Sequence, residues 1–247
     1  MASYDETEPR PPTAPPSGDA AAAGGVAIVR DYGVVHLRGA LSEREQAQLF
    51  AHIAGECETR PPTNPIPANV HLSSGAPGAP QRREPLHAFG ALVYARVAAE
   101  VGARLTPAQL RAEPSLRRIA RVSSGEQPAR VDQVTGVCYL PHSALANHQD
   151  GPRPLYTLSV ALGDACDFVV GARPPRAFAN ARAGAPTTLR VESGDAVFFD
   201  GGSVPHAVPR IHQGTAPPFW RRARARAGAR VSVLFREADG WDPKYLG

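Results

Sequence analysis

His148, Asp150 and His206 are the residues whose types and spacing point to chemistry. A His-x-Asp pair, followed further along the chain by one more His, supplies the two imidazoles and one carboxylate that proteins offer to Fe(II), with three metal positions left open. On an extended segment residues i and i+2 project to the same side, so residues 147–150 deliver an imidazole and a carboxylate to one ion. His-x-Asp pairs also occur in solvated loops, so the assignment needs support from elsewhere in the chain.

That support comes from a second motif, the segment from Arg230 to Arg236. Its β-branched and aromatic residues predict a buried strand with an arginine at each end. The two arginines are an even number of residues apart, so both guanidinium groups lie on one face. Buried cations require anions, and a guanidinium fork matches a carboxylate, so a dicarboxylate cosubstrate fits this need. Structural arginine–carboxylate bridges are the alternative.

The ordered set of motifs resembles the AlkB-like family of Fe(II)- and 2-oxoglutarate-dependent dioxygenases. The resemblance spans roughly residues 131 to 237 and is carried by four blocks, residues 138–150, 155–171, 189–206 and 230–236. It implies a mainly β protein with flanking helices, whose core is a double-stranded β-helix, or jelly roll.

The resemblance also implies roles for individual residues. His148, Asp150 and His206 would bind Fe(II). Arg230, helped by Tyr139, would hold the distal carboxylate of 2-oxoglutarate, and Arg236 would flank the end that chelates the metal. The implied reaction consumes O2, converts 2-oxoglutarate to succinate and hydroxylates a C–H bond of the substrate. A hydroxylated N-methyl group then leaves as formaldehyde.

The substrate is less well defined by the sequence. Members of the family that act on nucleic acid stack a flipped base between aromatic side chains, but this chain has no Phe, Tyr or Trp between Phe50 and Phe89. It also departs from the family pattern in having Val137 and Ser232 where Asn is common in the family, and Pro152 where some base-repair members have an acid.

The charge of the chain favours a nucleic-acid partner. The net charge is +4 and the pI about 9.2, and a basic cluster lies just before Arg230. The candidate substrate contacts are Arg210, Trp220, Arg221 and Arg222. A solvated arginine-rich loop, with Trp220 as its anchor to the barrel, is the alternative.

Three functions therefore remain open. The first is oxidation or demethylation of N-alkylated DNA or RNA, which we expect. The second is the same chemistry on a protein side chain or a small metabolite. The third is a non-catalytic module that binds nucleic acid, against which the intact triad and both arginines argue.

Length and composition predict one catalytic domain with an N-terminal tail and a supporting region. We expect a Pro/Ala-rich tail at residues 1–25, a supporting region with the substrate-side loop at residues 26–130, and the jelly-roll core at residues 131–240. No secretory or membrane-spanning segment is apparent, so we expect an intracellular monomer, cytoplasmic or nuclear. The three cysteines are expected to be buried free thiols.

Local patterns predict the supporting elements. Gly33 to Leu37 reads as a short strand. A capping box formed by Ser42 and Glu45 predicts a helix. Apolar residues at helical spacing predict a second helix from about Leu86. The proline-rich stretch 58–85 is expected to be a long loop.

Overall fold

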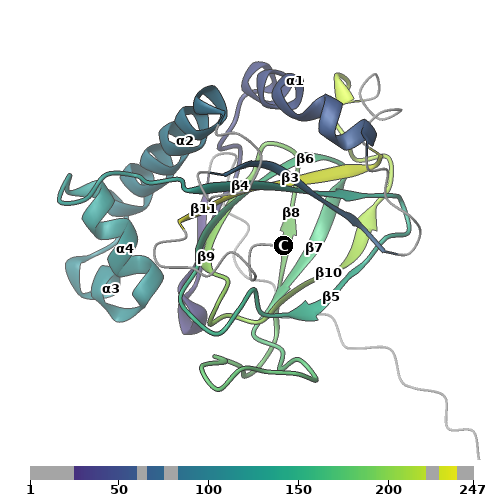
Figure 1. Ribbon diagram of the computed structural model, residues 1–247. Helices are drawn as coiled ribbons and strands as arrows, with labels where there is room; N and C mark the ends of the chain where they lie inside the picture. The colour runs from purple at the N-terminus through teal and green to yellow at the C-terminus, as the bar shows by residue number, and fades with distance from the viewer. Residues whose placement is uncertain (1–24, 60–65, 75–82, 221–227, 238–247) are drawn as a thin grey trace, which may run out of the picture.

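The computed structural model describes residues 25–59, 66–74, 83–220 and 228–237 (Figure 1). The tail expected at residues 1–25 lies outside these ranges apart from Gly25. The helices are the short 3-10 helix η1 (Arg30–Tyr32), α1 (Glu43–Thr59), α2 (Glu84–Gly102), α3 (Pro107–Ala112) and α4 (Pro114–Ser123).

The strands form two antiparallel sheets. In chain order they are β1 (Val26–Val29), β2 (Val34–Leu37), β3 (Ala68–Ser74), β4 (Gln133–Tyr139), β5 (Leu145–His148), β6 (Tyr156–Gly163), β7 (Ala165–Val170), β8 (Thr187–Val191), β9 (Ala196–Asp200), β10 (His206–His212) and β11 (Arg230–Glu237). The major sheet has the order β1-β2-β9-β6-β11-β4-β3 and the minor sheet the order β5-β10-β7-β8. This is the double-stranded β-helix expected from the sequence.

The helices cover the outer face of the major sheet (Figure 1). The expected capping box starts α1, because the amide of Ser42 donates to Glu45 and the amide of Glu45 donates to the Ser42 hydroxyl. Apolar residues of α1, α2 and α4, such as Leu49, Val93 and Ile119, pack against the outward residues of β6, β9 and β11 in one core. A second core fills the space between the two sheets.

The proline-rich stretch departs from the sequence expectation, since it contains β3. This edge strand pairs with β4, with His71 opposite Thr135 and a bulge between His71 and Ser73. The bulge changes which side chains face the sheet interior. Asn69 and His71 line the cavity between the sheets, whereas Leu72 packs in the helix-side core and the Ser73 hydroxyl contacts His87 of α2.

Each sheet has an edge strand that contributes residues to the same cavity. β3 ends the major sheet and β5 ends the minor sheet, and residues of both edge strands line the same cavity. The two edge strands therefore form part of the border of the cavity, and we call each of them a lip. Within the described residues, no helix is both long and apolar enough to cross a bilayer.

Candidate active site

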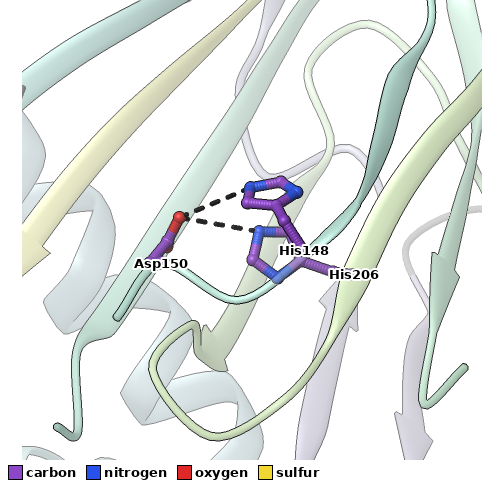
Figure 2. Close-up of side chains that lie close together, drawn as sticks. All are labelled: His148, Asp150 and His206. Atoms are coloured by element: carbon purple, nitrogen blue, oxygen red, sulfur yellow. Dashed lines mark ion pairs between the residues drawn. The ribbon is translucent and has the colours of Figure 1, made fainter. Parts of the chain in front are cut away.

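His148, Asp150 and His206 come together at one end of the space between the sheets (Figure 2). His148 ends β5 and His206 begins β10, and the two residues are direct partners in the antiparallel pair. Their ring centroids are 4.4 Å apart. The Oδ1 atom of Asp150 lies 3.6 Å from Nε2 of His148 and 3.9 Å from Nε2 of His206. In the described part of the chain, this is the one cluster of three or more such ligands found to converge in this way.

Hydrogen bonds orient both imidazoles for metal binding. Nδ1 of His148 lies 2.8 Å from the carbonyl oxygen of Ala146, and Nδ1 of His206 lies 3.0 Å from that of Val204. A carbonyl only accepts, so each Nδ1 carries the proton and donates it. The Nε2 atoms, which face Asp150, are thereby left with a free lone pair.

Two members of this cluster, His206 and Asp150, have protonation states that suit a cation. Burial, together with the nearby His148, lowers the pKa of His206 to about 4, so this ring is neutral at neutral pH. Burial opposes ionisation of Asp150, but the charge of Arg236 and the contact with His148 hold its pKa well below the usual range. Burial lowers the pKa of His148, but the adjacent carboxylate of Asp150 outweighs it and raises that pKa above its ordinary value.

Asp150 has an atom that no protein group satisfies. Its Oδ2 is buried without a hydrogen-bond partner, although a buried carboxylate oxygen is normally hydrogen-bonded or bound to a metal. The carboxylate is also held close to Gly201: the amide of Asp150 donates to the Gly201 carbonyl, and a Cβ on Gly201 would lie 2.2 Å from Oδ2. The orphaned oxygen and the two exposed lone pairs fit a bound Fe(II) ion.

The turn that carries His206 is fixed by Asp200, a buried residue at the end of β9. Its carboxylate accepts hydrogen bonds from the amides of Leu155 and Gly202 and from the hydroxyl of Ser203. These bonds tie the start of β6 to the turn before β10. Asp200 therefore positions a ligand without lining the cavity itself.

A cavity of about 230 Å³ extends from the triad between the sheets. It reaches Tyr139, Arg230 and Ser232, which lie together because Arg230 pairs with Tyr139 across β11 and β4. The intervening wall is largely apolar, with Phe168 and Leu234 among its residues. The expectation that both arginines of β11 face one side of the sheet is confirmed, since Arg230 and Arg236 both line this cavity.

Arg230 is 2% exposed and is only partly satisfied by the protein. One Nη atom donates to the carbonyls of Asp164 and Val191 at 2.8 and 3.3 Å, whereas Nε is buried without a partner. Among the described residues, no carboxylate forms an ion pair with Arg230. Burial raises the pKa of the neighbouring Tyr139, which therefore stays a neutral hydroxyl that can donate a hydrogen bond.

Arg236 belongs to the metal end of the cavity. Its guanidinium donates to the hydroxyl of Thr135 at 3.0 Å and lies 3.4 Å from Oδ1 of Asp150. The arginine–carboxylate bridge considered from the sequence is thus present at Arg236, where the carboxylate is the candidate metal ligand itself. It is not seen for Arg230 in the described residues.

The candidate substrate residues lie elsewhere. Trp220 is 0% exposed, packs against Phe50 and donates its indole N–H to the carbonyl of Ala229. Trp220 as a substrate contact is therefore wrong, because a ring enclosed in the helix-side core cannot stack on a base, and the alternative of a loop anchor is the one that the contacts support. Arg210 is exposed and does not line the cavity, and its Nε lies 4.0 Å from the carboxylate of Asp167. Arg221 and Arg222 lie outside the described residues.

Several cavity residues were not singled out from the sequence. Asn69 and His71 line the cavity from β3, and Gln149, between two of the triad residues, joins neighbouring loops. Asn69 and His71 are two residues apart, and this alternation could have marked them as facing one side of a strand. The surrounding prolines predicted a loop instead of a strand.

Comparison with known proteins identifies the family. A model described as the 2OG-Fe(II) oxygenase superfamily matches residues 33–236. The chain therefore belongs to this superfamily, whose members use Fe(II) and 2-oxoglutarate, and the resemblance inferred from the motifs is confirmed at that level. No curated protein sequence matches the chain.

Among the similar solved structures, that of OsALKBH1 supports the fold. The structure of OsALKBH1 is 18% identical with a TM-score of 0.62, over 86% of this chain and 100% of that one. AviO1 from Streptomyces viridochromogenes Tue57 is 18% identical with a TM-score of 0.47, over 87% and 93% of the two chains. A 2OG-Fe(II) oxygenase family oxidoreductase from Burkholderia pseudomallei is 16% identical with a TM-score of 0.44, over 83% and 84%.

Proposed function

We propose that this oxygenase removes N-alkyl groups from DNA or RNA, with His148, Asp150 and His206 as iron ligands and Arg230 as the anchor of 2-oxoglutarate. The assignment of the site rests on two buried polar atoms that lack hydrogen-bond partners and belong to residues lining the same cavity. Asp150 Oδ2 is an orphaned anion at one end, and Arg230 Nε is an orphaned cationic donor further along. A metal ion satisfies the first and a carboxylate satisfies the second.

The residues around these two groups support specific roles in cosubstrate binding. Arg230 donates to the distal carboxylate, and the neutral hydroxyl of Tyr139 adds a second donor beside it. Arg236 keeps Asp150 ionised and oriented through its charge and its bond to Thr135. Ser232 lines the cavity between the two arginines and offers a smaller hydrogen-bonding group where Asn is common in the family.

Bound Fe(II) supplies the activation of O2. In the overall reaction an N-methyl group, O2 and 2-oxoglutarate give the N–H product, formaldehyde, succinate and CO2. The protein's part is to orient the N-methyl group toward the triad that would hold the metal and to exclude bulk water. Phe168, Leu234 and the other apolar residues of the wall serve the second purpose, and Asn69 and His71 on the lip can hydrogen-bond the polar edge of the substrate.

Nucleic acid is the favoured substrate because of charge. The chain carries a net charge of +4, and polyanions associate with basic surfaces through release of counterions. The absence of aromatic residues among the described residues of the β3 lip favours the second candidate, the same chemistry on a protein side chain or a small metabolite.

Formaldehyde release tests the proposal. Iron-loaded protein is incubated with 2-oxoglutarate, O2 and either an N-methylated single-stranded oligonucleotide, an N-methylated histone peptide or no substrate. We expect formaldehyde and succinate in equal amounts with the oligonucleotide once the succinate formed without substrate is subtracted, and neither product from the His206→Ala variant above background. Formaldehyde released from the peptide but not from the oligonucleotide would exclude the nucleic-acid substrate and support the second candidate.

A further inference from the structure

The segment between β7 and β8, residues 171–186, forms a loop that we call the rim loop. It is bound to the metal end of the jelly roll at several points. The Asn147 side chain donates to the carbonyl of Ala172 at 2.8 Å, and the amide of Phe178 donates to the Gln149 side chain at 2.9 Å. Asn147 and Gln149 flank His148 in the sequence, so the rim loop is attached directly to the strand that carries a candidate iron ligand.

The other side of the rim loop is attached to the turn before His206. The amide of Gly171 donates to Pro205, the amide of Arg182 donates to Ser203, and the Asn180 side chain donates to Gly202, all at 2.8 to 3.0 Å. The Gln149 side chain also donates to Gly202. The loop is therefore held in place relative to both histidines of the triad, as a substrate-binding element must be.

The rim loop is basic and contains no acidic residue. Arg173 and Arg176 are exposed, whereas Arg182 is engaged by Glu113 and by the carbonyl of Asp31. The segments beside it, residues 140–163 and 200–213, contain acidic residues only at Asp150 and Asp200. Both of these carboxylates are shielded, with side chains no more than about a tenth exposed. Among the described residues, Glu113 is paired with Arg182, and no carboxylate forms an ion pair with Arg173 or Arg176.

An exposed aromatic ring accompanies these charges. Phe178 is 38% exposed, and among the described residues the other large hydrophobic side chains with this much exposure are aliphatic, Ile66 and Leu92. Phe178 is not part of either hydrophobic core. Arginines beside an exposed ring are the combination with which proteins bind single-stranded nucleic acid, through phosphate contacts and base stacking.

We propose that the rim loop binds the backbone of a single-stranded nucleic acid, with Arg173 and Arg176 on phosphates and Phe178 stacked on a base. The inference rests on the proposed function and extends it, because it places the substrate strand across the metal end of the jelly roll. A purely acidic peptide such as polyglutamate would satisfy the arginines but has no ring to stack on Phe178. A single strand is favoured over a duplex because its bases are free to stack on Phe178.

The test measures binding of an unmodified single-stranded DNA of about ten nucleotides by fluorescence anisotropy over a series of salt concentrations. Each phosphate contact contributes about 0.7 to the slope of log affinity against log salt, so Arg173→Gln with Arg176→Gln should lower the slope by about 1.4. The matched control, Arg44→Gln with Arg104→Gln, removes one charge from α1 and one from the segment that follows α2, on the helix side of the major sheet, and should leave the slope unchanged.

The ring is tested in the same assay. Phe178→Ala should weaken binding about ten-fold with no change in slope, since stacking is not ionic, and Phe178→Trp should retain the affinity. Polyglutamate of similar length should bind more weakly and show no effect of Phe178→Ala. Equal slopes for the wild type and the Arg173, Arg176 double variant, or equal sensitivity of polyglutamate to Phe178→Ala, would overturn the proposal.

Failure of this inference is distinguishable from failure of the proposed function. Formaldehyde released from the methylated oligonucleotide, combined with unchanged salt slopes in the double variant, would overturn the rim-loop assignment alone. If the salt slopes change as expected but no formaldehyde is released from the methylated oligonucleotide, the rim loop binds nucleic acid and the proposed demethylation is contradicted. Succinate formed without substrate should be the same in the rim-loop variants and the wild type, which shows that the iron site is intact.

Discussion

Replacement of Arg230 by Met should weaken the binding of 2-oxoglutarate strongly. Arg230 is 2% exposed, its Nε has no partner, and no described carboxylate pairs with it. Met keeps much of the aliphatic volume but removes the charge and the donors. A buried, charge-assisted pair to a carboxylate contributes on the order of 2–4 kcal/mol. The dissociation constant should therefore rise about 30- to 900-fold.

Calorimetric titration of 2-oxoglutarate into Mn(II)-loaded protein without O2 measures this constant. Arg230→Lys restores the charge but not the fork, so it should recover only part of the affinity. Arg118→Met is the matched control, because Arg118 is also buried but pairs with Glu237 away from the cavity. It should reduce stability and leave the affinity unchanged. The same dissociation constant for Arg230→Met and the wild type would refute this role of Arg230.

Three further predictions follow from single contacts. Gly201→Ala should lower the affinity for Mn(II) about ten-fold or more in a metal titration, because its Cβ would lie 2.2 Å from Oδ2 of Asp150; unchanged affinity would mean that this oxygen is not a ligand. His71→Leu should reduce formaldehyde release more than substrate-free succinate formation, and an equal loss of both would contradict a role in substrate orientation. The bond from Arg96 and the cap from Ser42 lower the pKa of Glu45 to about 2 from 4.5, so Glu45→Gln should cost about 1 kcal/mol of unfolding free energy at neutral pH. That difference should shrink as the pH falls from about 4.5 towards 2 in denaturant titrations, and a constant difference would argue against the ion pair.

The sequence was sufficient for the residues whose positions follow from local periodicity. Alternation along an extended segment predicted that Arg230 and Arg236 share a face, and both line the cavity. His148 and His206 could be predicted as ligands of one metal ion because the second histidine leads into a strand. The structure supplied the register that makes them neighbours, together with the Gly201 contact that holds Asp150 just beyond the end of β5.

The sequence was insufficient where tertiary contacts decide the outcome. Prolines on both sides of β3 suggested a loop, but pairing with β4 makes the segment a strand and brings His71 into the cavity. Trp220 stands beside a basic cluster, which suggested a stacking surface, yet the helix layer encloses it. The rim loop lacks any periodicity, so its position near the triad is revealed by its hydrogen bonds, including those to Asn147 and Gln149.

Succinate formation in the absence of substrate tests whether His148, Asp150 and His206 form the iron site of a 2-oxoglutarate-dependent oxygenase in this chain. Wild-type protein loaded with Fe(II) without O2 and then exposed to air should convert 2-oxoglutarate to succinate, detected by mass spectrometry, and should stop when Fe(II) is omitted. Asp150→Ala should abolish the product while the protein remains folded by circular dichroism. Succinate from Asp150→Ala at the wild-type rate would contradict the account.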